Sequence, residues 1–364
     1  MRQAPLAVAI LQMGAVVGAL VVTLSSGASL SDEASFDRTS LRGVLLPEAT
    51  LDRASLQEKY RRPAEIPFPE DNPYSKAKSH LGKLLFFDPI LSGSQTRSCA
   101  TCHNPSLSWG DGLPRAVGEK QEALALRAPT LLDVAWMPRP GWNGHFRDLE
   151  AVAFGPILSP GNMNMSEEKA VNERLSAIPG YVAAFEAAFG DKAITRRKIE
   201  LALATFERTI VSGETAFDRW INGEESAISA AAQRGFDLFN GKARCSSCHS
   251  GWSFTDFSFH DIGTGKDNDI GRAKLFPNSV KLRYAFKTPT LRDVARRAPY
   301  MHDGSVPTLE AVIDLYDRGG GDRPSRSDRI FPLKLTGNEK SDLIAFLQTL
   351  SGSPEPYPVP VLPR

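Results

Sequence analysis

The four cysteines of the chain fall into two identical patterns, in which two cysteines are separated by two residues and followed at once by a histidine. In this spacing each thiol can add across a vinyl group of a porphyrin, and the adjacent histidine can then bind the iron. The sequence therefore predicts two covalently bound c-type haems and a redox function. The predicted attachment residues are Cys99, Cys102 and His103 for the first haem, and Cys245, Cys248 and His249 for the second.

Other uses of paired cysteines fit the sequence less well. A structural zinc site could be built from two such pairs, but zinc does not require the histidine that follows each of them. A thioredoxin-like dithiol would follow a strand of a β-α-β unit, and no such pattern surrounds either motif. A disulfide across two intervening residues would be strained.

An internal repeat places the two motifs in equivalent halves of the chain. Residues 128–152 align without gaps onto residues 288–312, with eleven identities in 25 positions. The similarity extends upstream, because Gly-x-x-Leu-Phe precedes each haem motif, at residues 82–86 and 235–239. A duplication explains this order of helix, haem motif, long loop and Pro-Thr-Leu segment in both halves.

The elements that can be read around the motifs are helical. Apolar residues recur every three or four positions at residues 199–210 and 181–189, which predicts two helices that stop at Gly213 and at Gly190. Thr336 and Glu339 form a capping-box pattern ahead of the last expected helix. No convincing strand pattern is present, so we expect an all-α fold.

The first residues resemble an export signal. Arg2 precedes a mostly apolar stretch at residues 4–24, which ends in small residues suited to signal peptidase. We expect residues 1–28 to be a signal peptide and the protein to be periplasmic, because haem is attached to such motifs outside the cytoplasm. The apolar run is long for a cleaved signal, so a retained membrane anchor stays open as the alternative.

The charge of the mature chain argues against one class of partner. Removal of residues 1–28 takes away Arg2 as the only charged residue, which leaves equal numbers of basic and acidic residues. We therefore expect no nucleic acid partner. No later segment offers an uninterrupted apolar span, so no membrane span is expected in the mature chain.

Several further motifs give residues 79–350 a resemblance to the bacterial dihaem cytochrome c peroxidase and MauG superfamily. They are Leu-Gly-Lys-Leu-Leu-Phe-Phe-Asp-Pro at residues 81–89, the two haem motifs, Trp-Asn-Gly at 142–144, Gly-Pro-Ile at 155–157, and Ala-Pro-Tyr-Met-His-Asp-Gly at 298–304. The resemblance implies two cytochrome c-like haem domains: an N-terminal one where peroxide reacts and a C-terminal one that relays electrons. The expected organisation is an N-terminal extension (29–74), two haem domains (75–230 and 231–352) and a proline-rich tail (353–364).

The repeat also predicts which haem is open to substrate. Its offset of 160 residues aligns Tyr316 with Pro156. Proline has no side-chain donor atom, whereas a tyrosine phenolate can bind iron. If this position faces the distal side of each haem, the first iron is open to peroxide and the second is closed by Tyr316. A merely packed Tyr316, with Met301, His302 or His260 as the ligand, stays open as the alternative.

Two aromatic residues bear on the subfamily and on electron transfer. Conventional members of the family are expected to carry methionine at the place of Tyr316, whereas MauG-like members resemble this chain. An anionic phenolate favours higher iron oxidation states than a thioether does. Trp142 falls where the family places an aromatic residue between the haems, so we expect it to relay electrons, with simple packing as the alternative.

The expected distal pocket departs from the family pattern. The resemblance places a family glutamate at Asn162 and a family glutamine at Val152. Asparagine can hold peroxide by hydrogen bonds, but it cannot transfer protons. His145, where the family usually has arginine, could take over that role, and an ordinary hydrogen-bonded histidine is the alternative. A further alternative is that Met163 or Met165 closes the first haem to peroxide.

The resemblance also implies a calcium ion between the domains, held by an asparagine side chain and by backbone carbonyls. Those places fall at Arg127 and Arg297, whose charges disfavour calcium, so this cofactor is possible but doubtful. The acidic residues 267–269 are too short for a calcium loop, and we expect them to form a solvated turn.

The leading hypothesis is an exported dihaem peroxidase of MauG-like type. It would reduce hydrogen peroxide at the N-terminal haem and oxidise a small redox protein or a protein substrate through the C-terminal haem. Two alternatives are a conventional cytochrome c peroxidase with a soluble cytochrome or cupredoxin donor, and a non-enzymatic dihaem electron carrier or sensor.

Overall fold

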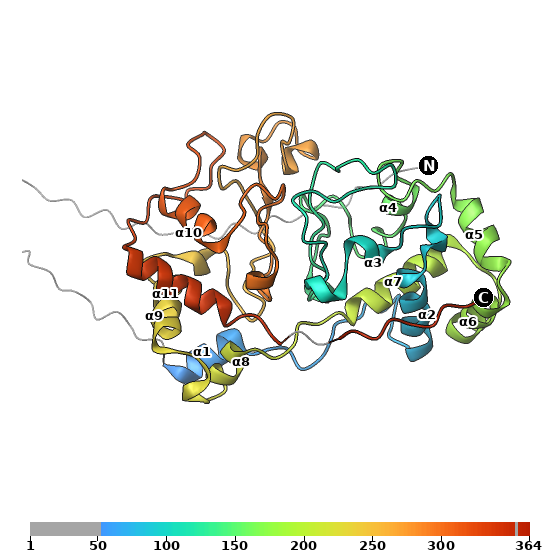
Figure 1. Ribbon diagram of the computed structural model, residues 1–364, viewed down its shortest axis with the longest axis horizontal. Coiled ribbons are helices and arrows are strands. Elements are labelled where there is room, and N and C mark those ends of the chain that lie inside the picture. Colours follow the sequence, from blue (N-terminus) through green and yellow to red (C-terminus); the bar gives the residue numbers. More distant parts are fainter. Residues whose placement is uncertain (1–51, 354–355) are drawn as a thin grey trace, which may run out of the picture. The chain divides into compact units, whose positions relative to one another are not determined.

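The computed structural model describes residues 52–353 and 356–364, so the expected signal peptide lies outside the described residues. The fold is all-α, as expected, and the described residues contain one small antiparallel strand pair, β1 (Phe259–His260) with β2 (Phe286–Lys287). No helix in the described ranges is long and apolar enough to cross a membrane. The α-helices are α1 (Arg53–Tyr60), α2 (Lys76–Phe87), α3 (Cys99–Cys102), α4 (Phe154–Leu158), α5 (Glu168–Ser176), α6 (Pro179–Phe189), α7 (Arg196–Arg208), α8 (Ala216–Ile221), α9 (Ala230–Asn240), α10 (Leu309–Asp317) and α11 (Gly337–Gln348) (Figure 1).

Two equivalent helix pairs form the framework of the two halves. Helix α2 packs against α7 in the first half, and α9 packs against α11 in the second (Figure 1). A Cβ atom on Gly82 of α2 would lie 1.9 Å from the carbonyl oxygen of Ala202, and one on Gly235 of α9 would lie 2.0 Å from that of Asp342. Both glycines are therefore required by the close approach of the paired helices. The shared Gly-x-x-Leu-Phe motif thus has the same structural role in each half.

Each half has its own hydrophobic core. The first core is built mainly from α2, α6 and α7, and includes Leu85, Phe86, Phe185 and Phe206. The second is built mainly from α8, α9 and α11, and includes Phe217, Phe239 and Phe346.

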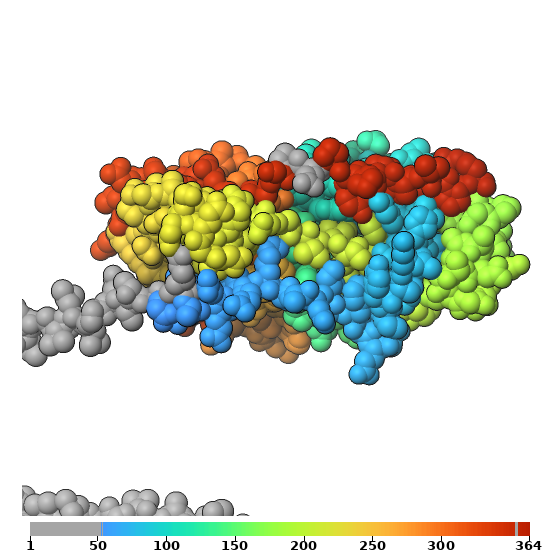
Figure 2. Space-filling model, turned by 90° about the horizontal axis from the view of Figure 1, so that it is seen from below, coloured from blue at the N-terminus to red at the C-terminus, as the bar shows by residue number. Residues whose placement is uncertain are grey.

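The two ends of the described chain pack on the halves that lie farther away in sequence. Tyr60, at the end of α1, is 1% exposed in the second core, where its ring stacks on Phe254 at 5.2 Å. Tyr357 of the proline-rich tail stacks on Phe87 at 5.9 Å and meets Trp109 edge to face at 4.9 Å in the first half. Figure 1 shows the tail running beside α2 and α6, and Figure 2 shows it lying on the surface there. Residues 356–364 of the tail belong to no helix or strand, yet they pack against the first half.

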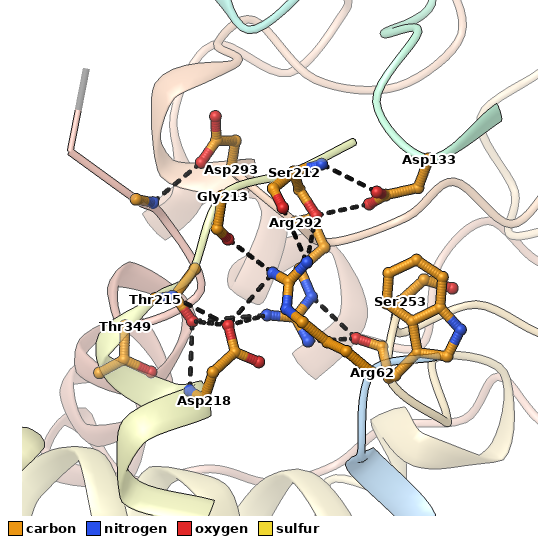
Figure 3. A network of polar contacts seen from close by, with 12 residues as sticks. Arg62, Asp133, Ser212, Gly213, Thr215, Asp218, Ser253, Arg292, Asp293 and Thr349 are labelled. Atoms are coloured by element: carbon orange, nitrogen blue, oxygen red, sulfur yellow. Dashed lines mark hydrogen bonds and ion pairs between the residues drawn. The ribbon is translucent and has the colours of Figure 1, made fainter. Parts of the chain in front are cut away.

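A polar network joins the extension to both halves (Figure 3). Asp133 accepts hydrogen bonds from the backbone N and the Oγ of Ser212 at 2.9 and 2.7 Å. Arg62 donates to the Ser212 carbonyl at 2.8 Å and pairs with Asp218 at 3.1 Å. The fully buried Arg292 donates to the same Asp218 carboxylate at 2.8 Å. Burial alone would raise the pKa of the Asp218 carboxyl. The two guanidinium groups outweigh this effect and hold the pKa below its usual value.

The helix ends match the sequence predictions in two cases and differ in one. Helix α6 ends at Gly190, which adopts the left-handed conformation with φ 83°, and α11 begins with the reciprocal capping box between Thr336 and Glu339. Helix α7 ends at Arg208, so the expectation that it continues to Gly213 is wrong. The reason is that the backbone after Arg208 binds to another segment: the carbonyl of Ile210 accepts from the amide of Asp133.

Candidate functional site

A single cavity of about 880 Å³ is lined by both haem motifs. The four cysteines of the two motifs are free thiols in the structure. All site residues expected from the sequence line this cavity: Cys99, Cys102, His103, Trp142, His145, Pro156, Asn162, Cys245, Cys248, His249 and Tyr316.

The two motif histidines are oriented by equivalent backbone carbonyls. The Nδ1 atom of His103 lies 3.3 Å from the carbonyl oxygen of Trp109, and that of His249 lies 2.9 Å from that of Phe254. Both acceptor residues adopt left-handed backbone conformations, with φ of 59° and 53°. Because a carbonyl can only accept, Nδ1 carries the proton in each ring and Nε2 is left to bind iron. Burial lowers the pKa of both histidines, which favours the neutral form that a ligand requires.

Tyr316 lies on α10 and faces the second haem motif. Burial raises the pKa of its phenol, and the nearby thiols of Cys245 and Cys248 act in the same direction. Its side chain is half-buried, and its hydroxyl forms no hydrogen bond with any residue that the structure describes, so this oxygen is available to a group bound in the cavity.

The two histidines considered as alternatives to Tyr316 are engaged elsewhere. The Nε2 atom of His260 lies 2.9 Å from a carboxylate oxygen of Asp256, and that of His302 lies 2.7 Å from one of Asp269. His302 is also stacked on Phe286 at 3.5 Å. Asp267 and Asn268 form an exposed turn, as expected, and Asp269 beside them pairs with His302.

The first half presents a different surface to the cavity at the equivalent position. Pro156 lies in α4, and its carbonyl accepts from the amide of Met163 at 3.1 Å. Asn162 is held through its backbone, whose carbonyl accepts from the amide of Glu119 at 2.8 Å. Met163 lines the cavity, as does Met301 of the second half. Both Met163 and Met165 also belong to the first hydrophobic core.

Trp142 lies where the two halves meet. Its indole Nε1 donates to the carbonyl of Arg127 at 3.0 Å, and its own carbonyl accepts from the amide of Lys287 at 2.8 Å. Its ring faces the edge of His302 at 6.5 Å between centroids. The indole therefore contacts both halves of the repeat.

His145 stands at the edge of the cavity with an exposed side chain. Its Nδ1 lies 3.0 Å from the Oδ1 of Asn143, and its ring contacts Phe146 at 3.7 Å between centroids. Partial burial and the charge of Lys287 lower its pKa. A neutral imidazole in this place can accept a proton from a molecule in the cavity.

Comparison with known proteins agrees with this site. Residues 76–226 match the family model described as di-haem cytochrome c peroxidase. The methylamine utilization protein MauG of Methylorubrum extorquens is 53% identical over 86% of this chain and 89% of its own length. The chain belongs to the dihaem cytochrome c peroxidase family.

Other members of the family extend this similarity. The MauG protein of Methylophilus methylotrophus is 44% identical over 85% of this chain and 92% of its own. The cytochrome c551 peroxidase of Nitrosomonas europaea is 33% identical over 80% and 85%. The crystal structure of a MauG-like protein associated with microbial copper homeostasis superposes with a TM-score of 0.74 at 31% identity, covering 80% of this chain and 95% of that one.

As a member of this dihaem peroxidase family, the protein is an oxidoreductase that acts on peroxide and carries two haem c groups. Its residues fit these cofactors, because each half offers two thiols and one imidazole whose Nε2 is free. The hydroxyl of Tyr316 offers one further oxygen donor beside the second motif.

Two charged residues of the cavity wall were missed by the sequence analysis. Glu207 of α7 lies near Cys99, and burial raises the pKa of its carboxyl to about 8 against the opposing charge of Arg208. Burial likewise lowers the pKa of Lys287 to about 7, and its Nζ contacts the sulfur of Met137 at 2.8 Å. For Glu207, its position in the sequence did indicate burial, because it follows the buried Leu203 by four residues and so lies on the same face of α7.

Proposed function

We propose that the protein is a periplasmic dihaem peroxidase of MauG-like type. Hydrogen peroxide is reduced at the haem held by His103, and a partner protein is oxidised through the haem held by His249 and Tyr316. The observation that carries this proposal is the unequal pair of repeat-equivalent residues on the cavity wall, Pro156 in the first half and Tyr316 in the second. The bound haems supply the redox chemistry, and the chain supplies positions, protons and charge.

In the first half, the chain leaves space for peroxide and offers polar groups to bind it. Pro156 has no donor atom, so it cannot compete with substrate for iron. The amide of Asn162 can hold peroxide by hydrogen bonds. His145, kept neutral by its lowered pKa, is the proposed acceptor of the peroxide proton.

In the second half, the phenol of Tyr316 would hold the iron of the second haem and so would keep substrate from it. A tyrosine ligand is anionic and favours higher oxidation states of iron, which suits a site that stores oxidising equivalents. The contacts of His260 and His302, the alternative ligands, support this assignment. The Nε2 atom of each histidine is already paired with a carboxylate oxygen.

Trp142 is the proposed relay between the two halves. Hydrogen bonds at both its indole nitrogen and its carbonyl fix it against segments of the first and second halves. A fixed indole between two redox groups can be oxidised and reduced again without rearranging its surroundings.

The relatives favour a partner protein over a soluble electron donor. The two that are 53% and 44% identical are both named methylamine utilization proteins, whereas those named cytochrome-c peroxidases are at most 35% identical. We therefore propose that the natural partner belongs to methylamine utilisation. The rival, a conventional peroxidase, predicts rapid steady-state oxidation of reduced cytochrome c by peroxide.

Electron paramagnetic resonance of the ferric holoprotein tests the proposal. We expect one high-spin and one low-spin signal, both lost when a stoichiometric amount of peroxide is added. In Tyr316→Phe the low-spin signal of the second haem should disappear, because phenylalanine cannot bind iron. The matched control is Tyr300→Phe, which removes another phenol of the cavity wall that donates only to the Val294 carbonyl.

Two results would contradict the proposal at different points. A wild-type spectrum that peroxide leaves unchanged would remove the peroxidase function. An unchanged low-spin signal in Tyr316→Phe would remove the ligand assignment while leaving the peroxidase function in place.

A further inference from the structure

A buried guanidinium group fills the boundary between the two halves. Arg127 of the first half donates through Nη1 to the carbonyl of Pro299 and through Nη2 to that of Arg297 at 3.0 Å. Its backbone amide donates to the carbonyl of His302 at 3.0 Å. One residue of the first half thus binds three backbone carbonyls from a single loop of the second. Of these, the carbonyl oxygens of Pro299 and Arg297 converge on the guanidinium, and carbonyl oxygens that converge in this way can hold a cation.

The same residue is connected to the proposed relay. The carbonyl of Arg127 accepts the hydrogen bond from the indole of Trp142 at 3.0 Å. Arg127 thus connects Trp142, through its backbone carbonyl, with the loop of the second half that its guanidinium binds.

Two positive charges already lie at this place, with Asp111 and Asp293 acting on them only at longer range. Arg297, whose carbonyl is one of the three acceptors, also carries a buried guanidinium, which donates to the carbonyl of Thr290 at 2.5 Å. Burial and the charge of Arg127 lower the pKa of Arg297 to about 10. Within the described ranges, neither arginine forms an ion pair with a carboxylate. A divalent ion here would meet two positive charges and would have to displace a guanidinium from the same oxygens.

The residues present therefore do not fit the calcium ion that the family resemblance implied. We propose instead that the Arg127 guanidinium is a built-in cation, which joins the two halves in place of calcium and makes the protein independent of that metal. The proposal concerns metal content and stability, so it can fail while the proposed peroxidase function stands, and the reverse also holds.

Metal analysis and thermal unfolding of the holoprotein test this. After gel filtration the wild type should contain no stoichiometric calcium, and neither excess EGTA nor added calcium should shift its Tm or its haem spectrum. Arg127→Asn should lower the Tm by about 3 °C, because two charge-assisted hydrogen bonds are lost. Arg127→Lys should recover part of that loss, since it keeps the positive charge.

A double variant distinguishes a cation site from ordinary packing. Arg127→Asn combined with Arg297→Gln leaves the carbonyls without either guanidinium, and calcium should then raise its Tm, as it does not in the wild type. The matched control is Arg97→Asn, which removes an arginine that lines the same cavity and donates to the Val117 carbonyl at 2.8 Å within the first half. This control should gain no response to calcium.

Three results would overturn the proposal: stoichiometric calcium in the wild type, a wild-type Tm lowered by EGTA, or a folded double variant that is indifferent to calcium. If the double variant does not fold, the wild-type measurements alone still decide between a built-in cation and a bound metal.

Discussion

Glu207 of α7 places a carboxyl group against the cavity near Cys99. Because burial raises its pKa from 4.5 to about 8, the folded protein keeps a proton that the unfolded chain releases at lower pH. The stability that this proton provides is complete below pH 4.5 and is lost as the pH rises through about 8. The pH dependence of unfolding should therefore contain a contribution from this one residue.

The variant Glu207→Gln cannot ionise, so we expect it to be more stable than the wild type at pH values above 8 and nearly equal to it at pH 4.5. Thermal unfolding of the holoprotein at these two pH values measures the difference. Glu173→Gln on α5, which removes an exposed carboxylate paired with Lys169, is the matched control and should show no such dependence. Equal Tm differences for both variants at both pH values would contradict the assignment.

The chemistry of single residues could be predicted where spacing alone decides it. The haem motifs are local in sequence, and Tyr316 was found because the repeat aligned it with Pro156. The properties of Glu207 and Lys287 could not be found in this way. Their pKa values depend on burial among distant segments, which no local pattern records.

The two helix pairs make a prediction at the level of elements. Gly82→Ala should lower the Tm by about 5 °C or more, because the added Cβ would lie 1.9 Å from the carbonyl oxygen of Ala202 and would push α2 away from α7. Gly213→Ala is the matched control, since a Cβ there meets nothing within 4 Å. A Gly82→Ala protein with the wild-type Tm would show that the helix pair tolerates separation.

Helix positions were predicted well from apolar spacing and caps, but one helix end was not. The side chain of Ile210 fits the apolar stripe of α7, and it is buried as that stripe requires. Its backbone is nevertheless not helical, because Asp133 binds both the Ile210 carbonyl and the amide of Ser212. A periodic pattern reports which side chains are buried, and it does not report such competition for the backbone.

For the whole molecule, the tail should stabilise the half against which it packs. Tyr357→Ala removes a ring that contacts Phe87 and Trp109, so the free energy of unfolding should fall by about 1–2 kcal/mol. Denaturant unfolding of the holoprotein measures this change. Val361→Ala, at a side chain that is 95% exposed, is the control and should have almost no effect. Equal stability of the two variants would mean that the tail contact is not held in solution.

The overall arrangement was predictable as two homologous halves and not in its terminal segments. The repeat and the family resemblance are carried by residues inside each half. The packing of Tyr60 and Tyr357 depends on single aromatic side chains in short segments that show no pattern of their own. Composition identified the tail as proline-rich, but it could not say which surface the tail would cover.

The crossing of the two ends has a consequence for engineering. If the chain were divided between its two halves, the C-terminal fragment would lack Tyr60 and the N-terminal fragment would lack Tyr357. Neither fragment would then keep its complete hydrophobic core. Chimaeras between relatives should therefore exchange each half together with the terminal segment from the opposite end of the chain. Although its two halves are repeats of one another, neither half can be exchanged as a self-contained unit.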